Sequence, residues 1–211
     1  MTVEVKICGV RTPAILEAAI SAGAEFVGFV FFPKSPRNLT VPDAVDLAGA
    51  VGRRARTVAV VVDPDDDLVD RIVANVRPDV LQLHGAETPE RVGAIKTRAG
   101  LTVFKAVPVS DAWEVAAAER YSAVADRILF DTKAPPGSEL PGGNGLSFDW
   151  AILEAAAAPF ALSGGLDADN VAEAIRQSGA ALVDVSSGFV SAPGEKDSIL
   201  INQFVHAVRE S

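Results

Sequence analysis

Three side chains suited to proton transfer interrupt apolar segments of this sequence. Cys8, Asp131 and Asp184 each lie at or near the end of a short run rich in Val, Ile, Leu or Phe. A positioned thiol or carboxyl group can act as a general acid or base. Burying such groups is costly unless they are paired, so their recurrence at the ends of apolar runs is typical of a reaction site rather than of a core.

These runs belong to a pattern that repeats along the chain. Each repeat has a β-branched run, a turn rich in glycine or polar residues, and an alanine-rich stretch with apolar residues three and four positions apart. Such periodicity predicts a strand followed by a helix. Strands are expected at residues 3–8, 26–31, 57–62, 80–83, 102–106, 127–131, 160–163 and 182–186. Helices are expected at residues 14–22, 42–51, 68–75, 89–98, 112–125, 170–178 and 200–208.

Two helix starts carry a clear capping signal, since Thr12 and Thr88 each precede a proline. A hydroxyl before a first-turn proline is a typical helix N-terminus. In the sixth repeat the signal is weaker, and Ser147 is the expected cap of a short helix over residues 149–156.

Alternating strands and helices predict a parallel sheet, which can be open or closed. An open doubly wound sheet usually has a glycine-rich turn into its first helix, whereas this chain has Cys8-Gly9-Val10-Arg11 there. Eight strands at about 26 residues per repeat favour a closed (β/α)8 barrel. No linker divides the sequence, so residues 1–211 are expected to form one catalytic domain.

In such a barrel the active site lies at the carboxyl ends of the strands, and alternate side chains of each strand face the interior. If the more apolar set of each strand faces the helices, one group of polar side chains converges inside. The group comprises Lys6, Cys8, Gln82, His84, Lys105, Asp131 and Asp184. A ring of polar side chains is hard to explain as packing and favours an enzyme.

Glycine-rich segments follow the last two strands. Residues 162–166 read Leu-Ser-Gly-Gly-Leu, and residues 184–188 read Asp-Val-Ser-Ser-Gly. Barrels commonly bind phosphate with these two loops through backbone N–H groups. Ordinary turns would explain either segment alone, but both together predict a phosphorylated small-molecule ligand. The expected phosphate-binding residues are Gly164, Gly165, Ser186, Ser187 and Gly188.

Composition narrows the function further. Cys8 is the one cysteine, which excludes an internal disulfide and any multi-cysteine metal site, and no metal is expected. A net charge of −9 disfavours nucleic acid as a partner. No apolar run is long enough to span a membrane and no secretion signal is present, so a cytoplasmic protein is expected.

Taken in order, the motifs resemble the phosphoribosylanthranilate isomerase family across the whole chain. The opening Lys6-Ile7-Cys8-Gly9 is similar to that family's first motif, and Ser35-Pro36-Arg37 is similar to its second-loop motif. The match continues at residues 81–85 (Leu-Gln-Leu-His-Gly), 129–131 (Leu-Phe-Asp), 141–145 (Pro-Gly-Gly-Asn-Gly), 162–166, 184–188 and 193–197 (Pro-Gly-Glu-Lys-Asp). Two departures are Asn144, where the family often has threonine, and Phe189-Val190, where it often has Val-Glu.

The resemblance implies an Amadori rearrangement of N-(5-phosphoribosyl)anthranilate in tryptophan biosynthesis, which needs no cofactor. It implies Cys8 as the base and Asp131 as the acid, and Asp131 would have to be protonated for that role. Reaction through a thiolate requires the pKa of Cys8 to be lowered by a cation or a helix N-terminus, and Lys6 is one candidate.

The remaining site residues would bind substrate or support the catalytic pair. The guanidinium of Arg37 matches the anthranilate carboxylate, because both are planar and bidentate. The other expected substrate-binding residues are His84, Gly143 and Gly145, and the supporting residues are Lys6, Gln82 and Asp184. For His84 a structural role is equally compatible with the sequence, and Asp184 could orient groups near the phosphate or neutralise an interior lysine.

Three rival assignments stay open at this point. The histidine-pathway isomerase performs the same type of rearrangement, but resemblance to it would imply an Asp–Asp pair, whereas Cys8 ends the first strand here. Indole-glycerol-phosphate synthase would imply other catalytic residues and a longer chain. A barrel without activity could bind metabolites or serve as a scaffold. The sequence allows a monomer or a homodimer, and it allows the loop of residues 132–145 to act as a lid.

Overall fold

The computed structural model describes residues 2–135, 137–138, 140–143, 145–157, 159–192 and 195–211. Asn144, Pro193 and Gly194, which belong to the motifs above, lie outside these residues. Within the described ranges, eight parallel strands form a closed barrel in chain order. The barrel closes because β1 pairs with β2 on one side and with β8 on the other. The expected (β/α)8 fold is confirmed.

The barrel strands match the predicted runs closely. They are β1 (Glu4–Cys8), β2 (Phe26–Phe31), β3 (Arg56–Val61), β4 (Val80–Leu83), β5 (Thr102–Val109), β6 (Arg127–Thr132), β7 (Ala161–Leu162) and β8 (Leu182–Val185). A further hairpin, β9 (Val190–Ala192) with β10 (Glu195–Lys196), was not expected from the sequence.

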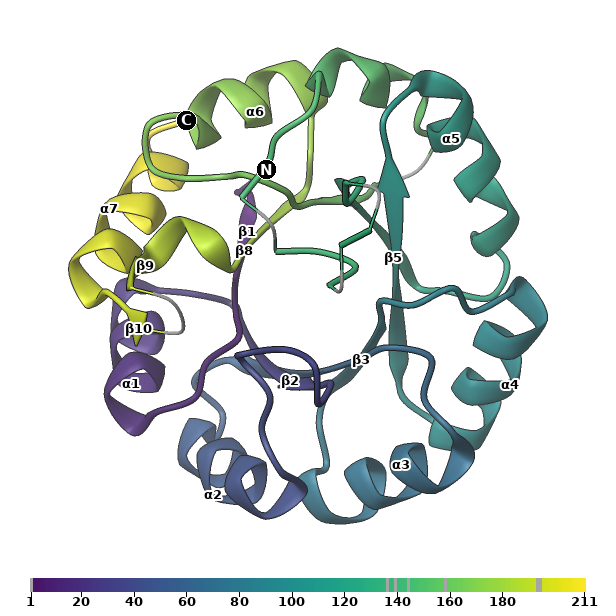
Figure 1. Ribbon diagram of the computed structural model, residues 1–211. Helices are drawn as coiled ribbons and strands as arrows, with labels where there is room; N and C mark the ends of the chain where they lie inside the picture. Colours follow the sequence, from purple (N-terminus) through teal and green to yellow (C-terminus); the bar gives the residue numbers. More distant parts are fainter. Residues whose placement is uncertain (1, 136, 139, 144, 158, 193–194) are drawn as a thin grey trace.

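An outer ring of helices surrounds the strands (Figure 1). It comprises α1 (Pro13–Ala22), α2 (Val41–Val51), α3 (Asp66–Arg71), α4 (Pro89–Ala99), α5 (Ala112–Ala117), α6 (Val171–Ser178) and α7 (Ser198–Arg209). Short helical turns complete the ring: η1 (Ile72–Val76), η2 (Ala118–Tyr121), η3 (Trp150–Ala155) and η4 (Ser187–Phe189). Among the described helices, none combines the length and apolar character that a membrane span requires.

Helix starts follow the capping chemistry of the sequence in most repeats. The hydroxyls of Thr12 and Thr88 accept hydrogen bonds from the first turns of α1 and α4, as predicted. The prediction for the sixth repeat was wrong in its cap: Asp149, not Ser147, accepts the hydrogen bond from Ala151. The carboxylate of Asp149 directly precedes the first turn and accepts the N–H of Ala151, whereas Ser147 lies two residues further from the helix.

The predicted helix over residues 112–125 was too long. Regular helix ends at Ala117 and continues as the tighter turn η2, which ends at Tyr121. The hydroxyl of the buried Tyr121 donates a hydrogen bond to the carbonyl of Glu87 at 2.9 Å. This contact with the β4–α4 loop holds Tyr121 in place, and a tertiary contact of this kind cannot be deduced from local periodicity.

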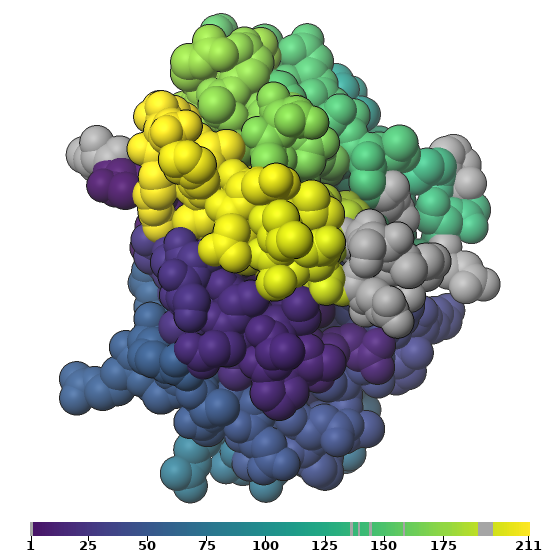
Figure 2. All heavy atoms as spheres, turned by 90° about the vertical axis from the view of Figure 1, so that its left-hand side faces the viewer, coloured from purple at the N-terminus to yellow at the C-terminus, as the bar shows by residue number. Residues whose placement is uncertain are grey.

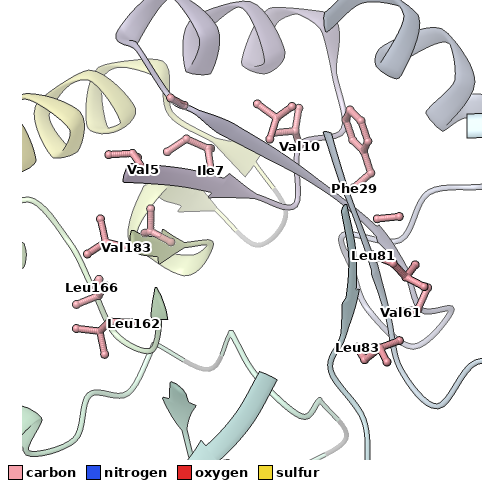
Figure 3. Packing of buried hydrophobic residues seen from close by; sticks show 14 of the residues in the cluster. Val5, Ile7, Val10, Phe29, Val61, Leu81, Leu83, Leu162, Leu166 and Val183 are labelled. Atoms are coloured by element: carbon pink, nitrogen blue, oxygen red, sulfur yellow. The ribbon is translucent and has the colours of Figure 1, made fainter. Parts of the chain in front are cut away.

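Alternation along the strands divides the apolar residues into two cores. The larger core lies between the strands and the helices, and Figure 3 shows Ile7, Leu81, Val183 and their neighbours packed there. A smaller core fills the barrel interior and includes Phe26, Val58 and Leu182. Along β1, β4, β6 and β8, the polar residues alternate in step with these interior residues, so they face the same side of the sheet. This parity points Cys8, Asp131 and Asp184 into the barrel.

Lys105 is a correction to the predicted inward group. Phe104 and Ala106 belong to the interior core, so Lys105 shares the outward parity of Val103 and Val107. Its ammonium is bound by Glu87 at 2.7 Å and donates to the carbonyl of Gly85 at 2.7 Å. The rule that the more apolar set faces the helices fails in β5, because both of its faces are apolar.

The final helix joins the two ends of the barrel. Figure 2 shows α7, in yellow, lying directly beside the purple N-terminal segments. Arg209 of α7 donates hydrogen bonds to the carbonyls of Val3 and Gly23 and pairs with Glu25 at 2.6 Å. These contacts fasten the C-terminal helix to the segments just before β1 and β2.

Candidate active site

A pocket opens at the carboxyl ends of the strands. Parity and strand register place most of the predicted site residues on its wall. Those that line it are Cys8, Arg37, Gln82, His84, Asp131, Gly143, Gly164, Gly165, Asp184, Ser186 and Ser187. Lys6 lies beneath the floor and is fully buried, whereas Gly145 and Gly188 lie outside the lining. Segments far apart in the sequence therefore meet around one cavity.

Cys8 ends β1 with its side chain almost entirely buried. Gly28 on the neighbouring strand β2 makes space for it: a Cβ at Gly28 would lie 3.1 Å from the Cys8 sulfur and 3.3 Å from the Lys6 ammonium. Burial raises the pKa of the Cys8 thiol above its ordinary value, and the nearby charge of Lys6 opposes that rise without cancelling it. The expectation of a lowered thiol pKa is therefore not met.

Lys6 and Asp184 form an ion pair below the pocket floor. Their charged atoms are 2.9 Å apart, and their side chains are 0% and 5% exposed. Burial alone would lower the pKa of Lys6, but the carboxylate of Asp184 raises it above its ordinary value, so the lysine stays charged. Of the two roles considered for Asp184, the contact it makes here is neutralisation of an interior lysine.

Asp131 faces the pocket from β6 and contacts His84 at the end of β4. The Nε2 atom of His84 lies 3.1 Å from Oδ2 of Asp131, and the backbone N–H of Thr132 donates to Oδ1 at 2.8 Å. Gly142 packs so closely over this pair that a Cβ there would lie 2.3 Å from Oδ2 and 2.8 Å from the imidazole. The carboxyl group is therefore held in one orientation.

Arg37 enters the pocket from the β2–α2 loop, where the hydroxyl of Ser35 accepts a hydrogen bond from its backbone N–H. Its side chain lies across Gly9, where a Cβ would come within 2.6 Å of the arginine Cδ. The guanidinium donates to the carbonyl of Gly143 at 3.5 Å. That long hydrogen bond leaves most of its donors available for a planar anion.

The glycines after β7 and β8 lie where loops meet at very short range. A Cβ at Gly164 would be 2.1 Å from the hydroxyl oxygen of Thr132, and one at Gly165 would be 2.5 Å from the backbone of Leu146. At Gly188 a Cβ would collide with the carbonyl oxygen of Leu166 at 2.3 Å. Gly164, Gly165, Ser186 and Ser187 of these loops line one end of the pocket, and glycine-rich loops with hydroxyl groups suit an anion.

Two side chains stand out that sequence reasoning did not fully use. The buried Oε1 atom of Gln82, at the pocket wall, has no hydrogen-bond partner among the described residues. Lys196 of β10, which belonged to a quoted motif but received no role, donates from its ammonium to the carbonyl of Ser186 at 2.6 Å. In the sequence, membership of that motif is the one signal that could have pointed to Lys196 as a neighbour of the end of β8.

Comparison with known proteins identifies relatives along the whole chain. The family described as N-(5'phosphoribosyl)anthranilate (PRA) isomerase matches residues 5–207. A Brucella canis N-(5'-phosphoribosyl)anthranilate isomerase is 53% identical over 213 residues, covering 100% of this chain and 96% of that protein.

Solved structures give the same answer. Phosphoribosyl anthranilate isomerase from Thermotoga maritima superimposes with a TM-score of 0.88 at 33% identity, and the match covers 100% of both chains. An isomerase of the same name in complex with reduced 1-(o-carboxyphenylamino)-1-deoxyribulose 5-phosphate superimposes with a TM-score of 0.85 at 31% identity, again over 100% of both chains.

Proposed function

The chain belongs to the N-(5'-phosphoribosyl)anthranilate isomerase family, and from this premise we propose how its pocket carries out that family's reaction. It is an isomerase of tryptophan biosynthesis that converts N-(5'-phosphoribosyl)anthranilate to 1-(2-carboxyphenylamino)-1-deoxyribulose 5-phosphate. The family match decides against the histidine-pathway isomerase and against indole-glycerol-phosphate synthase.

Asp131 is the proposed general acid. The reaction begins when the furanose ring oxygen gains a proton, which opens the sugar to an iminium ion. His84 and the N–H of Thr132 hold the carboxyl group of Asp131 toward the cavity, so its proton can be delivered to that oxygen. In this proposal His84 orients the acid, in addition to lining the substrate pocket.

Cys8 is the proposed general base. After ring opening the proton on C2 must be removed, which gives an enolamine that becomes the ketone. Cys8 ends β1 while Asp131 lies on β6, so the two groups approach the sugar from different walls of one cavity. This placement of a thiol and a carboxyl group around a single pocket is the observation that carries the proposal.

The rest of the pocket fits the other parts of the substrate. Gly164, Gly165, Ser186, Ser187 and Gly188 would bind the phosphate through backbone N–H groups and hydroxyls. At the other end Arg37, with Gly143 and Gly145 of the neighbouring loop, would bind the anthranilate carboxylate.

The unpartnered oxygen of Gln82 suits a sugar hydroxyl, which can donate a hydrogen bond to it. Beneath the floor, the Lys6–Asp184 pair supports the end of β1. Both roles are supporting: each holds the sugar or Cys8 in position for the proton transfers.

Organisation and surroundings complete the proposal. Residues 1–211 would act as one catalytic domain without a cofactor, in the cytoplasm, with no nucleic acid or membrane as partner. The net charge of −9 agrees with the absence of a nucleic-acid partner. A monomer and a homodimer both remain proposals; one structural neighbour is a monomeric form generated from a dimeric Thermotoga maritima enzyme.

The decay of anthranilate fluorescence on freshly formed phosphoribosylanthranilate tests the catalytic pair. Cys8→Ser and Asp131→Asn should each lower the rate by roughly 10²–10⁴, the usual contribution of a general acid or base. Both variants should still bind a phosphorylated product analogue, because neither residue belongs to the phosphate loops.

Asp46→Asn, on the exposed face of α2, is the matched control and should keep the wild-type rate. A Cys8→Ser enzyme that retains activity within about tenfold would remove Cys8 from the role of base. The same result for Asp131→Asn would remove Asp131 from the role of acid.

A further inference from the structure

Lys196 lies beside the proposed base although it is far from it in the sequence. Its ammonium donates to the carbonyl of Ser186 at 2.6 Å, and Ser186 directly follows β8. Register aligns Ile7 of β1 with Val185 of β8, so the next residues along these two strands are Cys8 and Ser186. The hairpin that carries Lys196 lies on the same side of the barrel as β1 and β8 (Figure 1). The ammonium therefore lies beside the neighbouring ends of β1 and β8, where its charge acts on the thiol.

The charge of Lys196 is not neutralised as that of Lys6 is. Lys6 is bound by Asp184 at 2.9 Å, so the pair acts on Cys8 mainly as a dipole. Among the residues that the structure places, Lys196 has a neutral carbonyl for a partner and no carboxylate within ion-pair distance. The aromatic ring of Phe189, whose centroid is 5.6 Å from the ammonium, is its other neighbour.

This placement is costly for the lysine. Burial lowers the pKa of Lys196 to about 8, with the positive charge of Arg37 adding to the effect and the Cys8 sulfur opposing it. Titratable groups with strongly shifted pKa values are more frequent at functional sites than elsewhere in a protein. A partly buried ammonium without a carboxylate partner is therefore a candidate for a functional role beside the pocket.

We propose that Lys196 is a positioning residue of the isomerase reaction, whose positive charge favours the reactive thiolate form of Cys8. The inference rests on the proposed function in one respect, since it takes Cys8 as the base. Lys196 touches neither the sugar nor the reacting atoms in this scheme. It acts on Cys8 through its charge alone. This charge lowers the pKa of Cys8 and so offsets part of the rise that burial causes.

Other titratable or charged groups also lie around the thiol. Those facing the same cavity or lying beneath it are Lys6 on β1, Asp184 on β8, Arg37 in the β2–α2 loop, His84 after β4 and Asp131 on β6. Lys6 favours the thiolate and Asp184 disfavours it. Because the pKa of Lys196 is lowered to about 8, its charge and the support that it gives the thiolate should be lost as pH rises through about 8.

The pH dependence of Cys8 alkylation by iodoacetamide, without substrate, tests the inference directly. Cys8 is the only cysteine of the sequence, so every alkylation event reports on it. In Lys196→Met the thiol should titrate at higher pH than in the wild type, because a neighbouring positive charge has been removed. In Lys196→Arg it should titrate near the wild-type pH, because the charge is kept. Lys34→Met, which removes an exposed lysine in the β2–α2 loop, should change nothing.

Steady-state kinetics provides the second measurement. Lys196→Met should lower kcat about tenfold at neutral pH, the effect of moving one pKa by a single unit, while KM stays nearly constant. The difference from the wild type should shrink as pH rises above about 8, because Lys196 of the wild type then loses its charge as well. In the wild type, the contribution of Lys196 to activity should decline above pH 8, where Lys196 loses its charge. In Lys196→Arg this decline should move to higher pH, because arginine keeps its charge there.

The outcomes separate the possible roles of Lys196. An unchanged thiol titration in folded Lys196→Met overturns the inference, and Lys196→Gln gives the same test if the methionine variant does not fold. A raised KM with unchanged kcat and unchanged thiol titration would also overturn it, since Lys196 would then be a ligand of a substrate anion. Failure of the proposed function is distinct: Cys8→Ser would remain active while the alkylation results stood unaffected.

Discussion

Breaking the buried pair of Lys6 and Asp184 should destabilise the barrel more than breaking any exposed ion pair. At 2.9 Å and an effective dielectric constant near 20, the attraction between the two charges is about 6 kcal/mol. That attraction offsets the cost of taking both ions out of water. In Asp184→Asn the ammonium of Lys6 would keep its burial and lose its partner, which costs about 3–5 kcal/mol.

Equilibrium unfolding in urea, followed by circular dichroism, measures this loss. Thermal unfolding gives the same loss as a change in Tm. For a chain of this length, each kcal/mol of lost unfolding free energy lowers Tm by about 2–4 °C, so the Tm of Asp184→Asn should be roughly 6–20 °C below that of the wild type. Lys6→Met should cost a comparable amount, because it leaves the Asp184 carboxylate alone. The double variant should be at least ~2 kcal/mol more stable than the sum of the two losses implies, since it leaves no isolated charge.

Glu17→Gln is the matched control. Glu17 pairs with Arg54 at 2.9 Å, the same separation, but the two side chains are 57% and 47% exposed. Water screens that pair, so its loss should be too small to resolve. If Asp184→Asn were as stable as Glu17→Gln, or if the losses from the two single variants were simply additive, the reasoning from burial would be refuted.

Three further predictions concern the pocket and its surroundings. Gly142→Ala should lower kcat by about tenfold or more while the fold persists, since the new methyl group would collide with the Asp131 carboxylate and displace the loop; wild-type kcat would contradict this packing. His84→Gln should retain more activity than Asp131→Asn in the fluorescence assay, because His84 orients the acid without replacing it; equal losses would make His84 itself a proton donor. Glu87→Gln should reduce stability by about 3–5 kcal/mol, because Lys105 would be left buried without its carboxylate, with kcat of the folded enzyme unchanged; a change in kcat alone would contradict a structural role.

Strand alternation explains why so much of the site could be predicted. In β1 and β8, each apolar outward residue alternates with an inward residue, so Cys8 and Asp184 fall on the interior face by parity alone. Parity is a local property of the chain. It needs no knowledge of the partner strand, and it therefore survives a prediction made without a structure.

Lys105 shows where that reasoning stops. Its strand carries apolar residues on both faces, so alternation does not say which face is inside. The deciding factor is Glu87, which lies 18 positions away in the sequence and supplies the carboxylate outside the barrel. Contacts at that distance depend on how the β4–α4 loop folds back, and residue types alone do not encode it.

Lys196 shows the same limit in a different form. Its place beside Ser186 depends on the β9–β10 hairpin, whose two strands are very short and carry no clear alternation. The motif containing Lys196 could be recognised, but the contact with Ser186 follows from the three-dimensional path of the chain. For the same reason the burial that raises the Cys8 pKa could not be anticipated, although the cation near it was.

The closing seam of the barrel, between β1 and β8, has a consequence for synthesis on the ribosome. The ribosome synthesises β1 first, but one edge of β1 pairs with β8, which is synthesised last of the eight barrel strands. The ion pair of Lys6 and Asp184 likewise joins residues that are 178 positions apart in the sequence. Until β8 emerges, a nascent chain carries an unpaired edge of β1 with an exposed thiol beside it, and open edges of this kind favour wrong pairing between chains. Chaperones that shield the growing chain would therefore protect the future reaction centre as well as the fold.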